Sequence, residues 1–213
     1  MRGRKPSLET TQRNWVRQWW EALQPRKADS PPAEGILATF DRGTRAQLRR
    51  CASAEDLLAQ PAALVLTDSL IRKGSGRWPL ADEPATYLHA ALTAGILAQV
   101  RRDTADGKTL AQRLATPPPN SDRPPMSELR FRRLQGARGT ADLFLQIQRA
   151  VQLVEATDVA QLADDLLTWL AEHDLPPDRS SDSVKFRWAY DYHLSARDRK
   201  VAEDPISDKE LTS

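Results

Sequence analysis

The stretch TADLFLQIQRAV, residues 140–151, decides the fold class of this chain. Its apolar side chains, with one that follows shortly after, recur at i, i+4, i+7, i+8 and i+11, the spacing of one helix face: Leu143, Ile147, Ala150, Val151 and Val154. Thr140 precedes the apolar run and is a residue type that caps helices. The opposite face is polar and carries Arg149. The sequence therefore predicts an amphipathic helix that begins at Thr140 and buries one side.

Segments with the same helical period flank this stretch on both sides, and Pro and Gly residues separate them. No part of the chain shows a convincing alternation of apolar and polar residues, which a half-buried strand would require. Further helices are predicted to begin near Thr10, Thr44, Ser53, Pro61, Pro84, Ser127, Asp158 and Ser183. The helix that starts at Pro84 is expected to reach about Arg102. We therefore predict an all-α fold.

A Pro-rich segment, TPPPNSDRPP at residues 116–125, interrupts the helical pattern. It can neither continue a helix nor pair in a sheet, because proline lacks the backbone N–H group and fixes φ. We predict two small helical bundles at residues 10–115 and 127–198, joined by a Pro-rich linker at residues 116–126. Residues 199–213 have few apolar anchors and are predicted to form a disordered tail.

Composition narrows the class of protein. The chain has 213 residues and 40% hydrophobic side chains, enough for a core, and it contains no apolar run of the length that a membrane span needs. Cys51 is the only cysteine, so an internal disulfide is excluded and the cytoplasm is the expected compartment.

Charge is divided along the chain. Residues 1–138 hold 23 Lys and Arg against 14 Asp and Glu, whereas residues 139–213 hold 8 against 15. A chain polarised in this way could bind a polyanion with one part and face basic partners with the other. Ordinary variation of charge over a surface explains the asymmetry equally well.

The sequence carries no pattern typical of a catalytic or metal site. His89, His173 and His193 lie far apart and in no metal-ligand spacing, and there is no P-loop or GxGxxG motif. Asp164 and Asp165 are adjacent, and neighbours on a helix point about 100° apart, so we expect them on a solvated acidic face. We predict a protein that is not an enzyme and that holds no cofactor and no metal.

Tryptophan is the other residue type with a chemical role to assign. Four of the six tryptophans lie on or beside apolar stripes and are expected in the core: Trp15, Trp19, Trp169 and Trp188. Trp20 lies at the edge of its stripe. Trp78 lies in a loop of Gly and Pro, and it is the one candidate for stacking on a nucleic-acid base.

Arginines form the candidate nucleic-acid-binding set. Arg49 and Arg50 lie at the end of a short helix. There they could either stabilise the negative end of the helix dipole or bind a phosphate through their guanidinium N–H donors. A groove that follows a nucleic-acid backbone would use several such residues together. The full predicted set is Arg49, Arg50, Arg101, Arg102, Arg130, Arg133, Arg138 and Arg149.

The segment SELRFRRL, residues 127–134, places two of these arginines unusually. On a helical wheel with its first leucine at 0°, Arg130 falls at about 100° and Arg133 at about 40°, within the arc that the apolar residues use. Arginines there must extend to solvent, pair with a carboxylate or await a ligand. Asp142 or Asp165 could neutralise one of them, and at this point the internal pairing and a nucleic-acid role are both open.

Seven stretches of this sequence occur in an order that resembles the CasB-type small subunit of the type I-E CRISPR complex Cascade. They are VRQWWEAL (16–23), RAQLRRCASAEDLL (45–58), LAQRLA (110–115), SELRFRRL (127–134), TADLFLQIQRAV (140–151), ADDLLTWL (163–170) and KFRWAYDYH (185–193). Helical runs of Arg and Leu are common singly, but seven in this order over residues 13–195 are specific.

The resemblance implies a protein of two small helical bundles that works as a pair of copies among the other Cascade subunits. Members of this family contact the CRISPR RNA and the target DNA, and they help to hold the displaced single strand, which stabilises the R-loop without cutting. The family's basic positions fall on Arg49, Arg50, Arg130, Arg133 and Arg149, and less directly on Arg138, Arg101 and Arg102. The chain departs from the family pattern at Gln148, where a second arginine is frequent, and in its longer or more Pro-rich segments 25–43 and 116–125.

We therefore predict a non-catalytic nucleic-acid-binding subunit of a type I-E CRISPR surveillance complex, which contacts the sugar-phosphate backbone in antiviral defence and involves no membrane. The alternative is an all-helical protein-protein adaptor without direct nucleic-acid binding. In the adaptor, carboxylates within and between subunits would satisfy the arginines.

Overall fold

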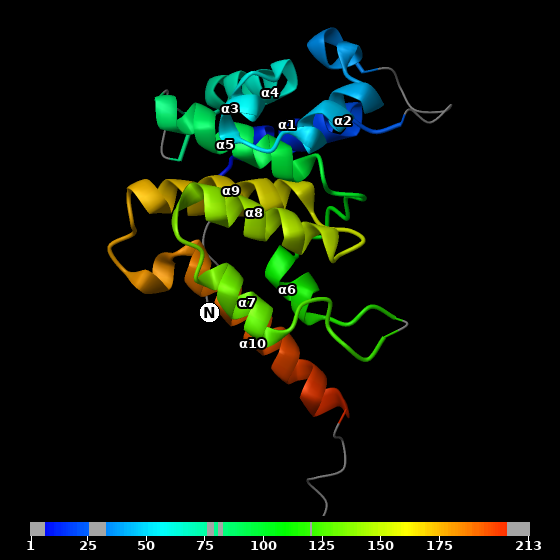
Figure 1. Ribbon diagram of the computed structural model, residues 1–213, viewed down its shortest axis with the longest axis vertical. Helices are drawn as coiled ribbons and strands as arrows, with labels where there is room; N and C mark the ends of the chain where they lie inside the picture. Colours follow the sequence, from blue (N-terminus) through cyan, green and yellow to red (C-terminus); the bar gives the residue numbers. More distant parts are fainter. Residues whose placement is uncertain (1–6, 26–32, 76–78, 81–82, 120, 204–213) are drawn as a thin grey trace, which may run out of the picture.

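The computed structural model describes residues 7–25, 33–75, 79–80, 83–119 and 121–203 of the chain (Figure 1). Its elements are α1 (Thr10–Ala22), η1 (Gly35–Thr39), α2 (Arg42–Arg50), α3 (Ala54–Leu58), α4 (Pro61–Lys73), α5 (Pro84–Leu97), α6 (Leu110–Ala115), α7 (Glu128–Gln135), α8 (Gly139–Gln152), α9 (Val159–Asp174), η2 (Ser180–Asp182) and α10 (Val184–Glu203). The described part of the chain contains no β-strand and only an isolated bridge between Asp103 and Thr157. The predicted all-α fold is confirmed.

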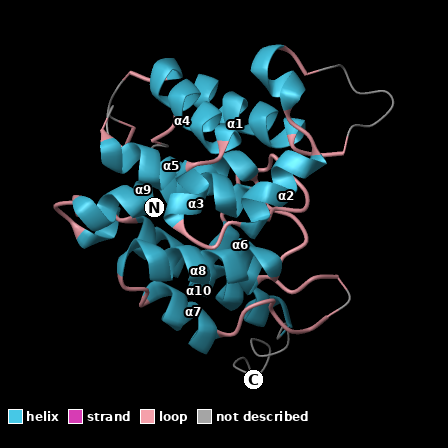
Figure 2. Cartoon of the chain, turned by 45° about the horizontal axis from the view of Figure 1, so that its top comes forward, coloured by secondary structure: helices cyan, strands magenta, loops and turns pink. Residues whose placement is uncertain are grey.

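The helix α9 lies at the centre of the molecule and is buried on almost every side. It packs against α1 and α5 on one side and contacts α8 and α10 on the other. Figure 1 shows α1, α3, α4 and α5 above α9, and α6, α7 and α10 below it, while Figure 2 shows the same helices forming one body. Its central place buries polar side chains as well as apolar ones, among them Asp164, Asp165 and Thr168.

Local sequence signals set where several helices begin. Ser53 Oγ accepts a hydrogen bond from the Asp56 backbone N–H at 3.1 Å, and the Asp56 carboxylate accepts one from the Ser53 N–H at 3.3 Å, which forms a capping box at the predicted start of this helix. Pro61 and Pro84 open α4 and α5, where a missing N–H group costs nothing. The Asp158 carboxylate caps α9, as predicted.

Two helices begin a little earlier than predicted. α2 starts at Arg42 rather than Thr44, because the Asp41 carboxylate caps it and accepts from the Thr44 backbone N–H at 2.8 Å. α8 starts at Gly139, whose φ of +75° suits glycine, so Thr140 lies inside the helix instead of capping it. Both helices thus lie where the sequence predicted them and begin one or two residues upstream of the predicted start.

Helices from both sides of the Pro-rich segment pack together. The Thr109 hydroxyl, at the start of α6, donates to the Asp191 carboxylate on α10 at 2.8 Å, and α6 packs against α10. Buried apolar residues of both sides belong to one continuous core. The division into two bundles stays a prediction. The last helix runs on to Glu203, past the predicted start of the tail at residue 199, and residues 204–213 lie outside the described part.

Most of the tryptophans are core residues. Trp19, Trp169 and Trp188 are buried, as predicted, and Trp20 is buried as well. Trp15, also expected in the core, is only half-buried: it packs against the core while its ring lies 5.0 Å from the Lys73 ammonium group. The stacking candidate Trp78 lies outside the described residues.

The acidic pair on α9 is buried, which corrects the expectation of a solvated face. Asp164 accepts a hydrogen bond from the Leu8 backbone N–H at 2.6 Å, and Asp165 accepts one from Trp188 Nε1 at 2.7 Å and pairs with Arg187. Burial raises the pKa of both carboxyl groups, that of Asp165 to about 6. Their partners come from distant parts of the chain, which a pattern within one helix does not reveal.

Candidate nucleic-acid interface

All eight arginines of the predicted set are exposed on the surface of the described structure. Six of them make no side-chain hydrogen bond or ion pair with any described residue: Arg50, Arg101, Arg130, Arg133, Arg138 and Arg149. An unpaired guanidinium group can meet a phosphate with its planar fork of donors without first breaking another ion pair.

One arginine outside the predicted set joins α2 to the segment that follows α5. Arg45, on α2, donates from Nε to the Ala98 carbonyl oxygen at 2.9 Å and from Nη2 to that of Val100 at 2.6 Å. These bonds satisfy carbonyl groups after the end of α5, which stops at Leu97 rather than at the predicted Arg102. Half-burial lowers the pKa of Arg45, because desolvation disfavours its charge. The sequence shows this residue only as one more arginine of a basic helix.

A second contact completes the junction between α2 and the chain after α5. Arg49 Nε donates to the Gln99 side-chain oxygen at 3.1 Å. The junction brings together four predicted residues, which we name the α2–α5 basic group: Arg49, Arg50, Arg101 and Arg102. This convergence between positions about fifty residues apart comes from tertiary contacts alone.

The end of α8 lies toward the α2–α5 basic group. Arg102 forms an ion pair with Glu155 at 3.5 Å, and its carbonyl oxygen accepts from the Thr157 backbone N–H at 3.0 Å. Both charged side chains of the pair are mostly exposed, so it contributes little to stability and leaves Arg102 accessible. Arg149 is exposed in the last turn of α8, shortly before Glu155 in the chain.

The arginines of α7 have surroundings different from those predicted. Phe131 and Leu134 are buried, but Leu129 is 61% exposed, so the buried face lies away from the side that the helical wheel indicated. Arg130 and Arg133 are therefore surface residues.

Internal pairing of one of these arginines with Asp142 or Asp165, which the sequence left open, does not occur in the described structure. Asp165 pairs with Arg187, and the Asp142 carboxylate accepts from the Arg138 backbone N–H at 3.0 Å and from the Gln146 side chain at 3.3 Å. Neither carboxylate pairs with an arginine of α7.

The predicted arginines do not form one cluster. Figures 1 and 2 place α7 and α2 on opposite sides of the layer that contains α8. Arg138 precedes the first residue of α8 and Arg149 lies near its last, which separates their backbones by about 16 Å along the helix axis. The set consists of the α2–α5 basic group at one end, Arg149 toward it, and Arg130, Arg133 and Arg138 at the other.

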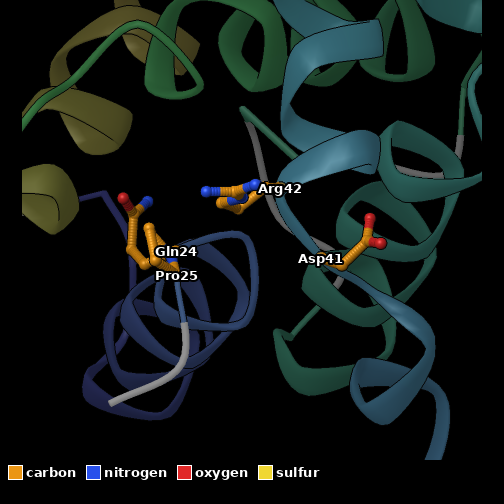
Figure 3. Close-up of a pocket in the computed structure, with 4 residues that line it drawn as sticks. All are labelled: Gln24, Pro25, Asp41 and Arg42. Carbon is orange, nitrogen blue, oxygen red and sulfur yellow. The ribbon is translucent and has the colours of Figure 1, made fainter.

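A hollow of about 290 Å³ lies between the end of α1 and the start of α2, lined by Gln24, Pro25, Asp41 and Arg42. Figure 3 shows Arg42 extending toward Gln24, while the Asp41 carboxylate points elsewhere. Asp41 is committed to capping α2, and the hollow holds charges of both signs. Nothing in its lining selects an anionic ligand.

The described residues also show what other chemistry the structure offers. Among them, no group of three His, Cys, Asp or Glu side chains lies close enough to hold a metal ion. His89 is buried with Nε2 at 3.3 Å from the Asp174 carboxylate, whereas His173 and His193 are exposed. No helix in the described part of the chain is long and apolar enough to cross a membrane.

The fold and the site together define an all-helical protein that displays, on two parts of its surface, arginines without a partner among the described residues. The chain belongs to the CRISPR-associated protein Cse2 family, because the family model matches residues 44–193. This match confirms the resemblance to the CasB-type small subunit that the seven stretches indicated.

Comparison with solved structures gives a similar fold. A chain in the crystal structure of E. coli Cascade bound to a PAM-containing dsDNA target superimposes with a TM-score of 0.55 and 20% sequence identity, covering 91% of this chain and 99% of that one. At this identity the likeness shows the fold alone. No curated protein matches the sequence.

Proposed function

We propose that this protein is a non-catalytic, nucleic-acid-binding subunit of a type I-E CRISPR surveillance complex, and that its arginines contact the sugar-phosphate backbone and stabilise the R-loop and the displaced strand. One observation carries the proposal. In a member of the Cse2 family, six of the eight arginines predicted from the sequence are exposed and make no side-chain hydrogen bond or ion pair with any described residue.

Backbone contacts are sufficient for such a role. The exchange of a DNA duplex for an RNA–DNA heteroduplex is nearly balanced in free energy, so a few phosphate contacts tip it. A subunit that grips the strand need not read its bases, and arginines on exposed helix surfaces suit this task. The separation of the predicted arginines over the molecule fits an extended strand better than a compact ligand.

The partners follow from the same proposal. They are the CRISPR RNA, the target DNA with its displaced strand, the other Cascade subunits and a second copy of this chain, all in the cytoplasm and without a cofactor. The similar chain comes from a complex bound to a dsDNA target, which supports this set of partners.

A second candidate, the protein-protein adaptor, has an observation of its own. Leu145 and Leu153 flank Arg149 at i−4 and i+4 on the outer face of α8, and they are 43% and 39% exposed. Exposed leucines in one stripe are typical of a surface that another protein covers. The adaptor would bind through these leucines and be insensitive to salt.

A titration of fluorescent single-stranded DNA with the purified protein at several salt concentrations tests the proposal. The test variant carries Arg130→Ala, Arg133→Ala and Arg149→Ala. Each neutralised phosphate contributes about 0.7 to the salt slope on a single strand, so the variant should lose about 2 from the slope and much of its affinity at low salt.

A control that removes two paired arginines carries Arg72→Ala and Arg132→Ala. These arginines are exposed but paired with Asp68 and Glu128, so the control should bind nearly as wild type does. Absence of binding by the wild-type protein at low salt, or equal losses in the two variants, would contradict the proposal.

A further inference from the structure

The outer face of α10 displays a row of aromatic side chains. Phe186, Tyr190 and His193 follow one another at i, i+4 and i+7, so they share one side of the helix. Phe186 is 41% exposed, Tyr190 is 38% exposed and His193 is exposed. The opposite side of the helix is buried through Val184, Trp188 and Tyr192. We name the exposed residues Phe186, Tyr190 and His193 the α10 aromatic row.

The row is held on a fixed support. Trp188 Nε1 donates to the buried Asp165 carboxylate at 2.7 Å, and the Tyr192 hydroxyl donates to the Met126 carbonyl oxygen at 2.7 Å. The ring centroids of Phe186 and Tyr190 are 6.5 Å apart with a tilt of 33° between the planes. The rings of Phe186 and Tyr190 therefore lie side by side on α10, whose opposite face is packed in the core.

The row ends against the helix that carries free arginines. The His193 ring meets the edge of Phe131 on α7 with 6.4 Å between centroids, and Phe131 stacks on Tyr192 at 4.0 Å. Arg130 and Arg133, on the same helix as Phe131, have no partner among the described residues. Cations and exposed aromatic faces thus occur on two packed helices.

The exposed residues of this part of α10 are not those of an aliphatic docking surface. Between residues 184 and 196 the exposed side chains are Lys185, Phe186, Tyr190 and His193, which include no aliphatic and no acidic residue. Aromatic rings beside cations are the combination that binds single strands, because bases stack on the rings while cations meet the phosphates.

We propose that Phe186 and Tyr190 form a stacking platform for unpaired bases of a single-stranded nucleic acid whose phosphates the α7 arginines hold. This inference rests on the proposed function and adds base stacking to the backbone contacts. The platform tolerates any sequence, since every base has a face that can stack.

The test uses the full-length protein and two fluorescent strands of equal length, one of mixed sequence and one of abasic sites. The variant carries Phe186→Ala and Tyr190→Ala. Stacking on a protein ring contributes about fivefold to a hundredfold in affinity for each base, so the variant should bind the mixed strand at least about fivefold more weakly. Its affinity for the abasic strand and its salt slope should stay as in wild type.

The conservative variant Phe186→Tyr with Tyr190→Phe keeps both rings and should restore wild-type binding, which separates stacking from loss of fold. Unchanged binding of the mixed strand by the alanine variant would overturn the platform, and salt-dependent wild-type binding in the same titration would leave the proposed function standing. An equal loss on the abasic strand would also overturn the platform. Failure of the wild type to bind either strand at low salt would overturn both proposals.

Discussion

Arg132 and Arg133 are neighbours on α7 that differ in their partners. Arg132 pairs with Glu128 one turn earlier, whereas Arg133 has no partner in the described structure. Both positions carry one positive charge, so the long-range field around the helix changes equally when either is removed. A difference between them in binding therefore reports direct contact with a phosphate.

We expect Arg133→Ala to lower the salt slope of single-strand binding by about 0.7, the contribution of one phosphate contact. Arg132→Ala should lower it by much less, because Glu128 already occupies that guanidinium group. Fluorescence anisotropy over a range of salt concentrations measures both slopes. Equal slopes in the two variants would show that α7 acts only through its overall charge.

Asp165 makes stability depend on pH in a direction opposite to that of a typical paired carboxylate. Burial raises its pKa from 3.8 to about 6, and the nearby charge of Arg187 only partly offsets this shift. Between these two values the folded state binds the proton more tightly than the unfolded state does. The contribution of Asp165 to the free energy of unfolding therefore falls as pH rises from about 4 to about 6, and it is constant above that.

The substitution Asp165→Asn isolates this contribution. The free energy of unfolding of wild type minus that of the variant should fall between about pH 4 and pH 6 and stay constant above about pH 6. Urea unfolding at a series of pH values measures the difference. A difference that grows in favour of wild type over this interval would contradict the raised pKa.

At the scale of the element, α7 shows where a helical pattern fails. The helical wheel gave equal weight to its three apolar residues, Leu129, Phe131 and Leu134. In the structure Phe131 and Leu134 are buried, whereas Leu129 is exposed. Packing against α10 determines which face of α7 is buried, because Tyr192 of α10 stacks on Phe131. A short basic helix has too few apolar residues to define its own buried face, so its neighbour defines it.

This correction predicts unequal effects of two substitutions on the same helix. Phe131→Ala removes a buried ring from its stack and should lower the free energy of unfolding by about 3–5 kcal/mol. Leu129→Ala should change it by less than about 0.5 kcal/mol. Denaturant unfolding measures both. A large loss in the Leu129 variant would restore the buried face that the wheel indicated.

Helix starts were predicted better than helix ends, for a physical reason. The capping box of Ser53 and the prolines Pro61 and Pro84 act through local backbone groups that the sequence displays. The end of α5 depends instead on Arg45, which binds carbonyl groups more than fifty residues away. The same limit applies to the site. Arginine could be chosen from the sequence as the candidate residue type, whereas the exposure of Arg130 and Arg133 and the α2–α5 basic group both depend on tertiary contacts.

For the whole molecule, the division of charge along the chain does not become a division of the surface. Several acids of the negative part are internal: Asp158 and Asp164 are buried, and Asp165 pairs with Arg187. Asp158 also forms an ion pair at 3.0 Å with Arg17, from the positive part of the chain. The Arg17–Asp158 pair neutralises charge between the two parts inside the fold, while arginines of both parts, Arg149 included, have no partner among the described residues.

Because helices from both sides of the Pro-rich segment pack together, we expect the protein to stay assembled when the chain is cut within that segment. A protease site introduced between the exposed Ser121 and Asp122 should be cut readily, but the two fragments should remain associated. α1 and α5 pack on α9, and α6 packs on α10, so the cut leaves an interface whose core is apolar and insensitive to salt. Gel filtration of the cut protein in low and high salt measures the association, with the uncut protein as the control. Separate elution of the fragments would mean that each bundle holds together without the other, and that the contacts between them contribute little stability.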